Sequence, residues 1–282
     1  MKTPKIIVSL LSAAAVWSST LVVWPQTPQQ QAGPAPLVAA GSGVNLGITR
    51  ILATAFMTAH PSVVIEVPGS VGTKGAIAAV ADGAITLGLL SRPLKEEEKA
   101  PGLVARPYAR TPMVVGVHPS VPDEEITSQE LGDIYRGTKT HWKDGREIVV
   151  LTREPFDSGI QVIQKEIPGF KQAYEESHQA NRWTVYFTDQ DANQALSRTP
   201  FAIGFTDLGM IATEHLNIKA LRLNGVAPSA ETLNSDQYPL SRVLFFLYRD
   251  GTLPEGVKAF LDFVYSEGGS DILRSHGYLP VN

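Results

Sequence analysis

The chain has 282 residues, of which 43% are hydrophobic and 18% are charged, and its formal net charge at pH 7 is -4. This length accommodates two globular domains, and the acidic balance argues against a general nucleic-acid binder, which needs a basic face. The absence of cysteine excludes thiol nucleophiles, disulfides and cysteine-bound zinc, and the six histidines show no metal-ligand spacing. We therefore expect neither a metal nor another cofactor.

The N-terminus has the pattern of an exported protein. Lys2 and Lys5 precede an apolar run over residues 6–24, and a Gln- and Pro-rich linker follows over 27–36. A basic start before an apolar segment is typical of a secretory signal or a membrane anchor. Both remain open, because the run approaches the length of about 20 residues that spans a bilayer and no small-residue cleavage site precedes Pro25. We predict a signal peptide or anchor plus linker over residues 1–35, and a periplasmic or otherwise extracytoplasmic location for the rest.

After the linker, predicted strands and helices alternate. Short apolar strands are expected at 36–40, 63–67 and 85–90. The first two lead through turns of small residues into helical patterns, and the third ends at Ser91-Arg92. This repetition indicates a parallel sheet that binds its ligand at the carboxyl ends of the strands. The run Lys95-Glu-Glu-Glu-Lys99 is predicted to be a solvated surface turn or helix.

The second half of the chain predicts another lobe of the same class. A strand at 113–117 is expected to cross into this lobe, and a strand at 243–248 to return from it. Between them we predict a capping box and further elements at 127–135, 148–151, 158–167, 170–179, 183–187, 189–197 and 201–205. Helical spacing of apolar residues over 257–265 places a C-terminal helix on the first lobe. The predicted fold class is α/β with two lobes, each a mostly parallel sheet flanked by helices, joined by two crossing strands. Lobe 1 comprises residues 36–113 and 243–282, and lobe 2 comprises residues 114–242.

The stretch from Leu151 to Ile160 carries the strongest chemical signal. Arg153 stands just beyond a buried strand, and Asp157-Ser158-Gly159 then opens a helical pattern. Free backbone N–H groups at a helix start bind anions, and an arginine adds a planar fork that grips two oxygens of a tetrahedral anion. The alternative is that Asp157 or Ser158 only caps the helix and that Arg153 is a surface charge.

Three further turns strengthen the anion hypothesis, since each follows a predicted strand. They are Gly41-Ser42-Gly43, Gly69-Ser70-Val71-Gly72-Thr73 and Ser91-Arg92. One such turn is weak evidence, because Gly and Ser are ordinary loop residues. Four turns, with one arginine in each lobe, predict an oxyanion held between the lobes by backbone N–H groups, hydroxyls and guanidinium groups.

At this point the chain resembles a known family, the phosphate-binding extracytoplasmic component of bacterial phosphate uptake transporters, within the type II periplasmic-binding proteins. The resemblance covers Pro36 to the C-terminus and rests on Gly69–Thr73, Ser91-Arg-Pro93, Ile134-Tyr-Arg-Gly137 with Trp142, Ala202-Ile-Gly-Phe205, Asn224–Pro228 and Tyr238-Pro-Leu-Ser-Arg242. It implies a monomeric, non-enzymatic binding protein that holds inorganic phosphate in an interlobe cleft and delivers it to a membrane ABC permease. The phosphate-binding positions that it implies are Gly43, Val44, Ser70, Thr73, Ser91, Arg92, Arg153, Ser158, Gly159 and Ile160.

The chain departs from the family pattern at several of these positions. Gly43-Val44 lacks the hydroxyl of the first turn, and Ile160 replaces a threonine. Arg92 and Thr86 stand where relatives tend to carry an aspartate, so Asp157 is the nearest remaining carboxylate, with Glu154 behind it. A carboxylate that accepts the proton of phosphate would reject sulfate. We therefore expect phosphate to be preferred over sulfate by a smaller margin than in relatives that have the aspartate.

Parts of the sequence also suggest other functions. Gly41-x-Gly43-x-x-x-Gly47 with Glu66 imitates a dinucleotide-binding fingerprint, but its last glycine comes one residue late. Ser158 lacks the elbow pattern of a serine hydrolase nucleophile. An oxyanion sensor or adhesin without a transport role stays open, as does the binding of another oxyanion such as sulfate.

Overall fold

In a computed structural model of the chain, residues 36–251 and 253–281 are described. The signal or anchor and linker predicted over residues 1–35 lie outside this part. Among the described residues, no helix is both long enough and apolar enough to cross a membrane.

One mixed sheet organises the described residues, and its main path has the strand order β2-β1-β3-β11-β4-β8-β6-β7. Parallel strands form both ends of this path. They are β1 (Leu37–Gly41), β2 (Ile65–Glu66) and β3 (Leu87–Leu90) at one end, and β6 (Val149–Arg153), β7 (Thr184–Tyr186) and β8 (Ala202–Asp207) at the other. We call the parts built on these two sets of strands the first and second lobes.

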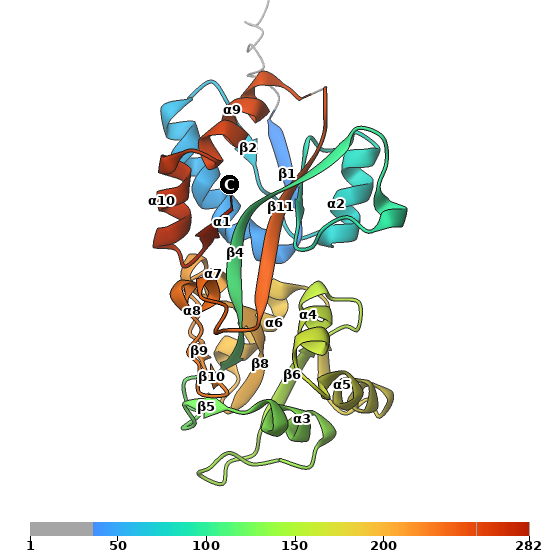
Figure 1. The fold of residues 1–282 in the computed structure, drawn as a ribbon, viewed down its shortest axis with the longest axis vertical. Coiled ribbons are helices and arrows are strands. Elements are labelled where there is room, and N and C mark those ends of the chain that lie inside the picture. The colour runs from blue at the N-terminus through green and yellow to red at the C-terminus, as the bar shows by residue number, and fades with distance from the viewer. Residues whose placement is uncertain (1–35, 252, 282) are drawn as a thin grey trace, which may run out of the picture. The chain divides into compact units, whose positions relative to one another are not determined.

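Two long strands join the lobes. The strands β4 (Leu103–Val117) and β11 (Ser241–Arg249) pair antiparallel along their length and run side by side in Figure 1. The strand β11 also pairs with β3 of the first lobe, and β4 also pairs with β8 of the second. The predicted fold class with two crossing strands is therefore confirmed. Short strands complete the topology: β12 (Leu279–Pro280) and β9 (Lys219–Ala220) pair with β4, and β5 (Glu125–Ile126) pairs with β10 (Arg222–Leu223).

Helices cover both lobes. Those that begin or pack around the first lobe are α1 (Gly43–Ala59), α2 (Gly72–Ala81), α9 (Glu255–Val264) and α10 (Glu267–Ser275). The others are α3 (Ser128–Arg136), α4 (Ser158–Glu166), α5 (Phe170–Gln179), α6 (Asp189–Arg198), α7 (Leu208–Thr213) and α8 (Ala230–Asn234), together with the 3-10 turn η1 (Glu96–Glu98). The predicted capping box is present, since Thr127 accepts a hydrogen bond from the backbone N–H of Glu130 and Glu130 accepts one from that of Thr127.

Each lobe is built around one large apolar core. The core of the first lobe includes Leu52, Tyr108 and Phe246, and that of the second includes Ile134 and Val150. The side chain of Met210 joins the first core, although its residue number falls in the range predicted for lobe 2, because α7 packs against α1.

Several elements were not predicted from the sequence, among them α7, α8 and the short strands β5, β9, β10 and β12, and two further differences have a clear cause. The strand β4 begins at Leu103, ten residues before the predicted start, because β11 supplies a pairing partner along the whole segment. The polar residues and prolines of 103–112 hid this strand from a search for apolar runs. The helix α10 was not predicted, since Gly268 and Gly269 interrupt its pattern; its cap is the Ser266 hydroxyl, which accepts from Gly269.

Replacement of Phe246 by alanine should destabilise the protein strongly. The Phe246 ring is fully buried in β11, stacks on Tyr108 at a centroid distance of 4.1 Å and meets the edge of Phe260. We expect Phe246→Ala to lower the free energy of unfolding by about 3–5 kcal/mol, measured by urea denaturation. The control Phe187→Ala removes a ring that is 72% exposed and should change the free energy by no more than about 0.5 kcal/mol. Equal losses in the two variants would contradict this assignment of the core.

Candidate anion-binding site

A polar cleft of about 410 Å³ lies where the two lobes meet. Seven of the predicted site residues line it: Gly43, Ser70, Thr73, Ser91, Arg92, Arg153 and Ser158. The remaining three, Val44, Gly159 and Ile160, belong to the first turns of the two helices that start at the cleft. The structure thus brings together turns that are far apart in the sequence.

Hydroxyl groups from both lobes meet in the cleft. The Ser91 hydroxyl lies 2.7 Å from the Ser158 hydroxyl across the cleft, and 3.1 Å from the Thr73 hydroxyl of its own lobe. Ser42 also donates a hydrogen bond to Ser91, at 3.1 Å. Sequence reasoning noted Ser42 only as part of its turn and missed it as a site residue. The Ser70 hydroxyl has a different role, because it donates to the carbonyl of Gly41 and accepts from Gly72, which closes its own turn.

The side chain of Asp157 caps the N-terminus of α4. One carboxylate oxygen of Asp157 accepts hydrogen bonds from the backbone N–H groups of Gly159 and Ile160, at 2.9 and 3.1 Å. The capping alternative is therefore correct for Asp157. Ser158 is not the cap, and its hydroxyl is directed at Ser91 instead. Gly159 allows a close approach at this point, since a Cβ there would collide with the guanidinium of Arg242.

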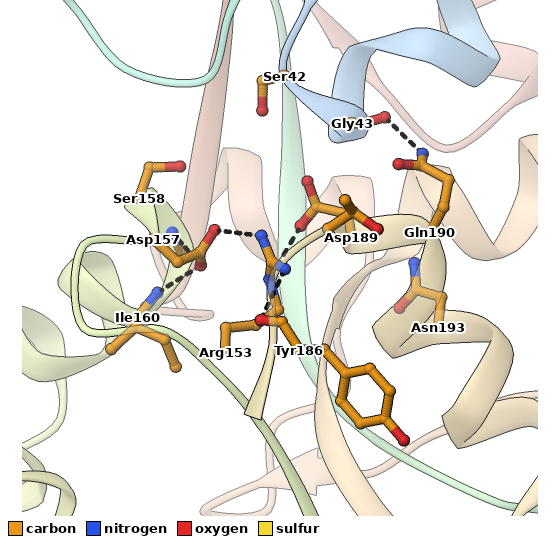
Figure 2. A network of polar contacts seen from close by, with 12 residues as sticks. Ser42, Gly43, Arg153, Asp157, Ser158, Ile160, Tyr186, Asp189, Gln190 and Asn193 are labelled. Carbon is orange, nitrogen blue, oxygen red and sulfur yellow. Dashed lines mark hydrogen bonds and ion pairs between the residues drawn. The ribbon is translucent and has the colours of Figure 1, made fainter. Parts of the chain in front are cut away.

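Arg153 is the last residue of β6 and is buried, at 8% exposure, so the surface-charge alternative is wrong. Its guanidinium donates to the carbonyl of Tyr186 at 3.0 Å and to the second carboxylate oxygen of Asp157 at 3.1 Å. These two hydrogen bonds, which Figure 2 shows, fix the plane of the guanidinium group. Its buried Nε has no hydrogen-bond partner. A buried, oriented guanidinium with a spare donor is suited to an anionic ligand.

Arg92 is held by its own lobe. Its two terminal nitrogens donate to the two carboxylate oxygens of Glu98, at 2.6 and 2.7 Å. This pairing holds the pKa of Glu98 down, at about 2, although partial burial opposes the shift. The expectation that the whole acidic run is solvated is therefore wrong for Glu98, whose side chain is 15% exposed. Glu98 and the carbonyl of Pro93 occupy the terminal nitrogens of Arg92, and its role in binding stays a prediction.

Sequence reasoning missed three buried charges next to the cleft. Asp189, the first residue of α6, lines the cleft, and its carboxylate lies 3.8 Å from the guanidinium groups of both Arg153 and Arg242. Arg242 on β11 also pairs with Asp207 at the end of β8, at 3.3 Å. The motif ending in Arg242 was noticed in the sequence, but its contacts with the site were not. Asp189 was predicted only as a helix start.

These residues form a chain of alternating charge, in the order Asp157, Arg153, Asp189, Arg242 and Asp207. Figure 2 shows its first part, with the guanidinium of Arg153 between the carboxylates of Asp157 and Asp189. Burial raises the pKa of Asp189, and it raises the pKa of Asp207 to about 7, with Arg242 opposing both shifts. The site therefore combines donors for an anion with carboxylates whose negative charge is partly compensated by Arg153 and Arg242.

The described residues offer binding groups rather than an assembled metal centre. No group of three His, Asp or Glu side chains in residues 36–251 and 253–281 is placed to hold a metal ion. What converges on the cleft is a set of hydroxyls, a guanidinium and the starts of α1 and α2, which together can surround and hold a small oxyanion; the first N–H groups of α4 predicted to bind it, those of Gly159 and Ile160, are occupied by Asp157.

The chain is similar to several known proteins. The phosphate-binding protein PstS of Bacillus subtilis is 25% identical over 256 residues, covering 87% of this chain and 80% of that protein. PstS of Borreliella burgdorferi is 26% identical over 202 residues, covering 69% and 72%. A solved structure from Clostridium perfringens, described as a phosphate ABC transporter substrate-binding protein with bound phosphate, has a TM-score of 0.76 and 25% identity. The alignment covers 88% of this chain and 100% of that one.

A family model described as a PBP superfamily domain matches residues 26–268 of the chain. The match includes most of the first lobe, the whole second lobe, the two crossing strands and every residue of the cleft named above. The chain therefore belongs to the PBP superfamily.

Proposed function

We propose that the protein is an extracytoplasmic binding protein that captures inorganic phosphate between its lobes for delivery to an ABC permease. The observation that carries this proposal is the meeting of Ser91 and Ser158 beside the buried, oriented guanidinium of Arg153. Phosphate is a small tetrahedral anion with four oxygens, and such a ring of donors from both sides can reach all of them. The similarity to proteins named as phosphate-binding supports the choice of ligand.

The neutral donors also suit a charged ligand that must be released again. Hydroxyl groups serve as donors or acceptors, so Ser91, Ser158 and Thr73 can turn their protons from one another toward an anion. Backbone N–H groups at the start of α1 add the positive end of a helix dipole. Arg153 is the main source of full positive charge in this arrangement.

The predicted lobe ranges, 36–113 with 243–282 and 114–242, lead to a proposal about motion. Contacts from the two lobes meet in the cleft, such as the Ser91–Ser158 pair and the hydrogen bond from Gln190 of α6 to the carbonyl of Gly43. The strands β4 and β11 are the covalent links between the lobes and hence the natural hinge. We propose that phosphate closes the cleft by bending at these strands.

Replacement of Arg153 should weaken phosphate binding selectively. We expect Arg153→Ala to raise the dissociation constant by about 10- to 100-fold, the usual worth of a hydrogen bond to a charged group, measured by titration calorimetry. The control Arg222→Ala removes the same charge from an exposed position on β10 and should bind like the wild type. Undiminished affinity in Arg153→Ala would remove the central contact, and no phosphate binding by the wild type would refute the proposed function.

Phosphate should make the protein more compact in solution. Closure around the anion brings the lobes together, so small-angle scattering should give a smaller radius of gyration at saturating phosphate. Arg153→Ala at the same phosphate concentration serves as the control and should show less compaction. An unchanged radius in a wild-type protein that binds tightly would argue against a closing motion.

The full chain should be found outside the cytoplasm. The basic and apolar N-terminus predicts export, with a cleaved signal or a retained anchor as the two alternatives. Fractionation of cells that express the full chain should recover it in the extracytoplasmic or membrane fraction, and a variant lacking residues 1–35 should stay in the cytoplasm. Recovery of the full chain in the cytoplasm would contradict the export proposal.

Gel filtration of the exported form should give a monomer.

A further inference from the structure

The discrimination between phosphate and sulfate requires an acceptor for a proton. Near neutral pH, inorganic phosphate carries at least one proton, whereas sulfate carries none. A buried carboxylate beside the ligand accepts a hydrogen bond from the phosphate proton, but it repels sulfate, because two unshielded anions then face each other. The question is which carboxylate of this cleft has a free lone pair that faces the ligand.

Asp157, the carboxylate expected from the sequence, is already occupied. Three donors hold it, namely the N–H groups of Gly159 and Ile160 and the guanidinium of Arg153. These bonds fix the start of α4 and orient the arginine. Glu98 is likewise bound to Arg92 through both of its oxygens. Neither carboxylate is placed to accept a further proton from a ligand.

Asp189 has the required capacity. Its side chain is 12% exposed and lines the cleft on the side opposite Ser158, as Figure 2 shows. Its ion pairs with Arg153 and Arg242 are both 3.8 Å long, beyond hydrogen-bond length, and it accepts a hydrogen bond from the backbone N–H of Val44, so further lone pairs of the two oxygens are left for a ligand. The carboxylate also reaches the start of α1, where a Cβ on Gly43 would lie 2.7 Å from its Oδ2. It therefore stands between the two lobes, beside the hydroxyls and the guanidinium.

We propose that Asp189 is the specificity-determining residue of the site, the carboxylate that accepts the proton of the bound anion and thereby favours phosphate over sulfate. This inference rests on the proposed function and names the group that sets the choice among oxyanions. The residue with this role is the first residue of α6, in the second lobe. Neither the turns of small residues nor the Tyr238–Arg242 motif indicated this position in the sequence.

The charges around Asp189 determine how it responds to pH. The groups that face it are Arg153 on β6, Asp157 before α4, Asp207 on β8, Arg242 on β11 and Glu214 after α7, and the cleft adds Lys74, Arg92, Lys95 and Glu154. Burial is the main cause that raises the pKa of Asp189, and Arg242 opposes it. As pH falls, Asp189 should therefore take up a proton earlier than an exposed aspartate. The protonated carboxyl then becomes a donor and admits sulfate.

Selectivity in Asp189 variants tests this role. We expect Asp189→Asn to lower the ratio of phosphate to sulfate affinity by about 100-fold, because the amide offers sulfate a donor and no charge. Asp189→Ser provides a second neutral replacement with the same expected direction. Asp191→Asn is the matched control, since Asp191 is an exposed aspartate in the first turn of the same helix and is bound to Thr188. Titration calorimetry with each anion gives the ratio of the two affinities. If Asp189 had a purely structural role, its replacement would weaken the binding of both anions alike.

The pH dependence of sulfate binding is an independent readout, because sulfate itself does not titrate in this range. Wild-type affinity for sulfate should rise from about pH 8 to about pH 5, and this rise should be clearly smaller in Asp189→Asn, where the neighbouring Asp207, whose pKa burial raises to about 7, still titrates. A selectivity ratio that is unchanged in both Asp189 variants would overturn the inference while leaving phosphate binding intact. A wild type that binds neither anion would instead refute the proposed function.

Discussion

The antiparallel ladder between β4 and β11 is the constraint on which the rest of the structure depends. It runs from the pair Leu103–Arg249 to the pair Pro112–Ser241, with one bulge between Leu244 and Phe245. Each strand then pairs with the sheet of a different lobe, β11 with β3 and β4 with β8. The carboxyl ends of the parallel strands in the two lobes consequently face one cleft. For this reason the hydroxyls of Ser91 and Ser158, which belong to turns far apart in the sequence, lie 2.7 Å from each other.

The same ladder brings buried charges behind the cleft. Arg242 of β11 lies between Asp189 and Asp207, and several polar atoms of Arg242 and Asp207 have no hydrogen-bond partner. Buried ion pairs with such incomplete geometry stabilise a fold little, since their attraction hardly repays their desolvation. Their presence is better explained by the ligand site. With all groups ionised, three carboxylates and two guanidinium groups give the chain of charges a net charge of about -1, so this background resists a fully deprotonated dianion.

The cluster of hydroxyls in the cleft follows a different principle, because these groups are neutral. The hydroxyls of Ser42, Thr73, Ser91 and Ser158 satisfy one another in this structure. Hydroxyls serve as donors as well as acceptors, so this arrangement avoids unpaired buried charge and keeps donors ready for an oxyanion. The guanidinium of Arg153, whose Nε has no hydrogen-bond partner, is oriented by Asp157 and the carbonyl of Tyr186. Rigid support for one charged contact and adaptable neutral contacts around it are consistent with binding and release.

The sequence by itself determined the local chemistry of this protein. Apolar runs and small-residue turns predicted the parallel strands, the starts of α1, α2 and α4, and the positions of Arg153 and Ser158 at the end of a strand and the start of a helix, because these features depend on neighbours within a few residues. Only the tertiary structure decided that Asp189 and Arg242 reach the site and that the hydroxyls of Ser91 and Ser158 meet. Asp189 and Arg242 are 53 residues apart in the sequence, and they meet only because the strand order puts β11 between the lobes. Sequence spacing carries no record of that order, so contacts that depend on it had to be read from the fold.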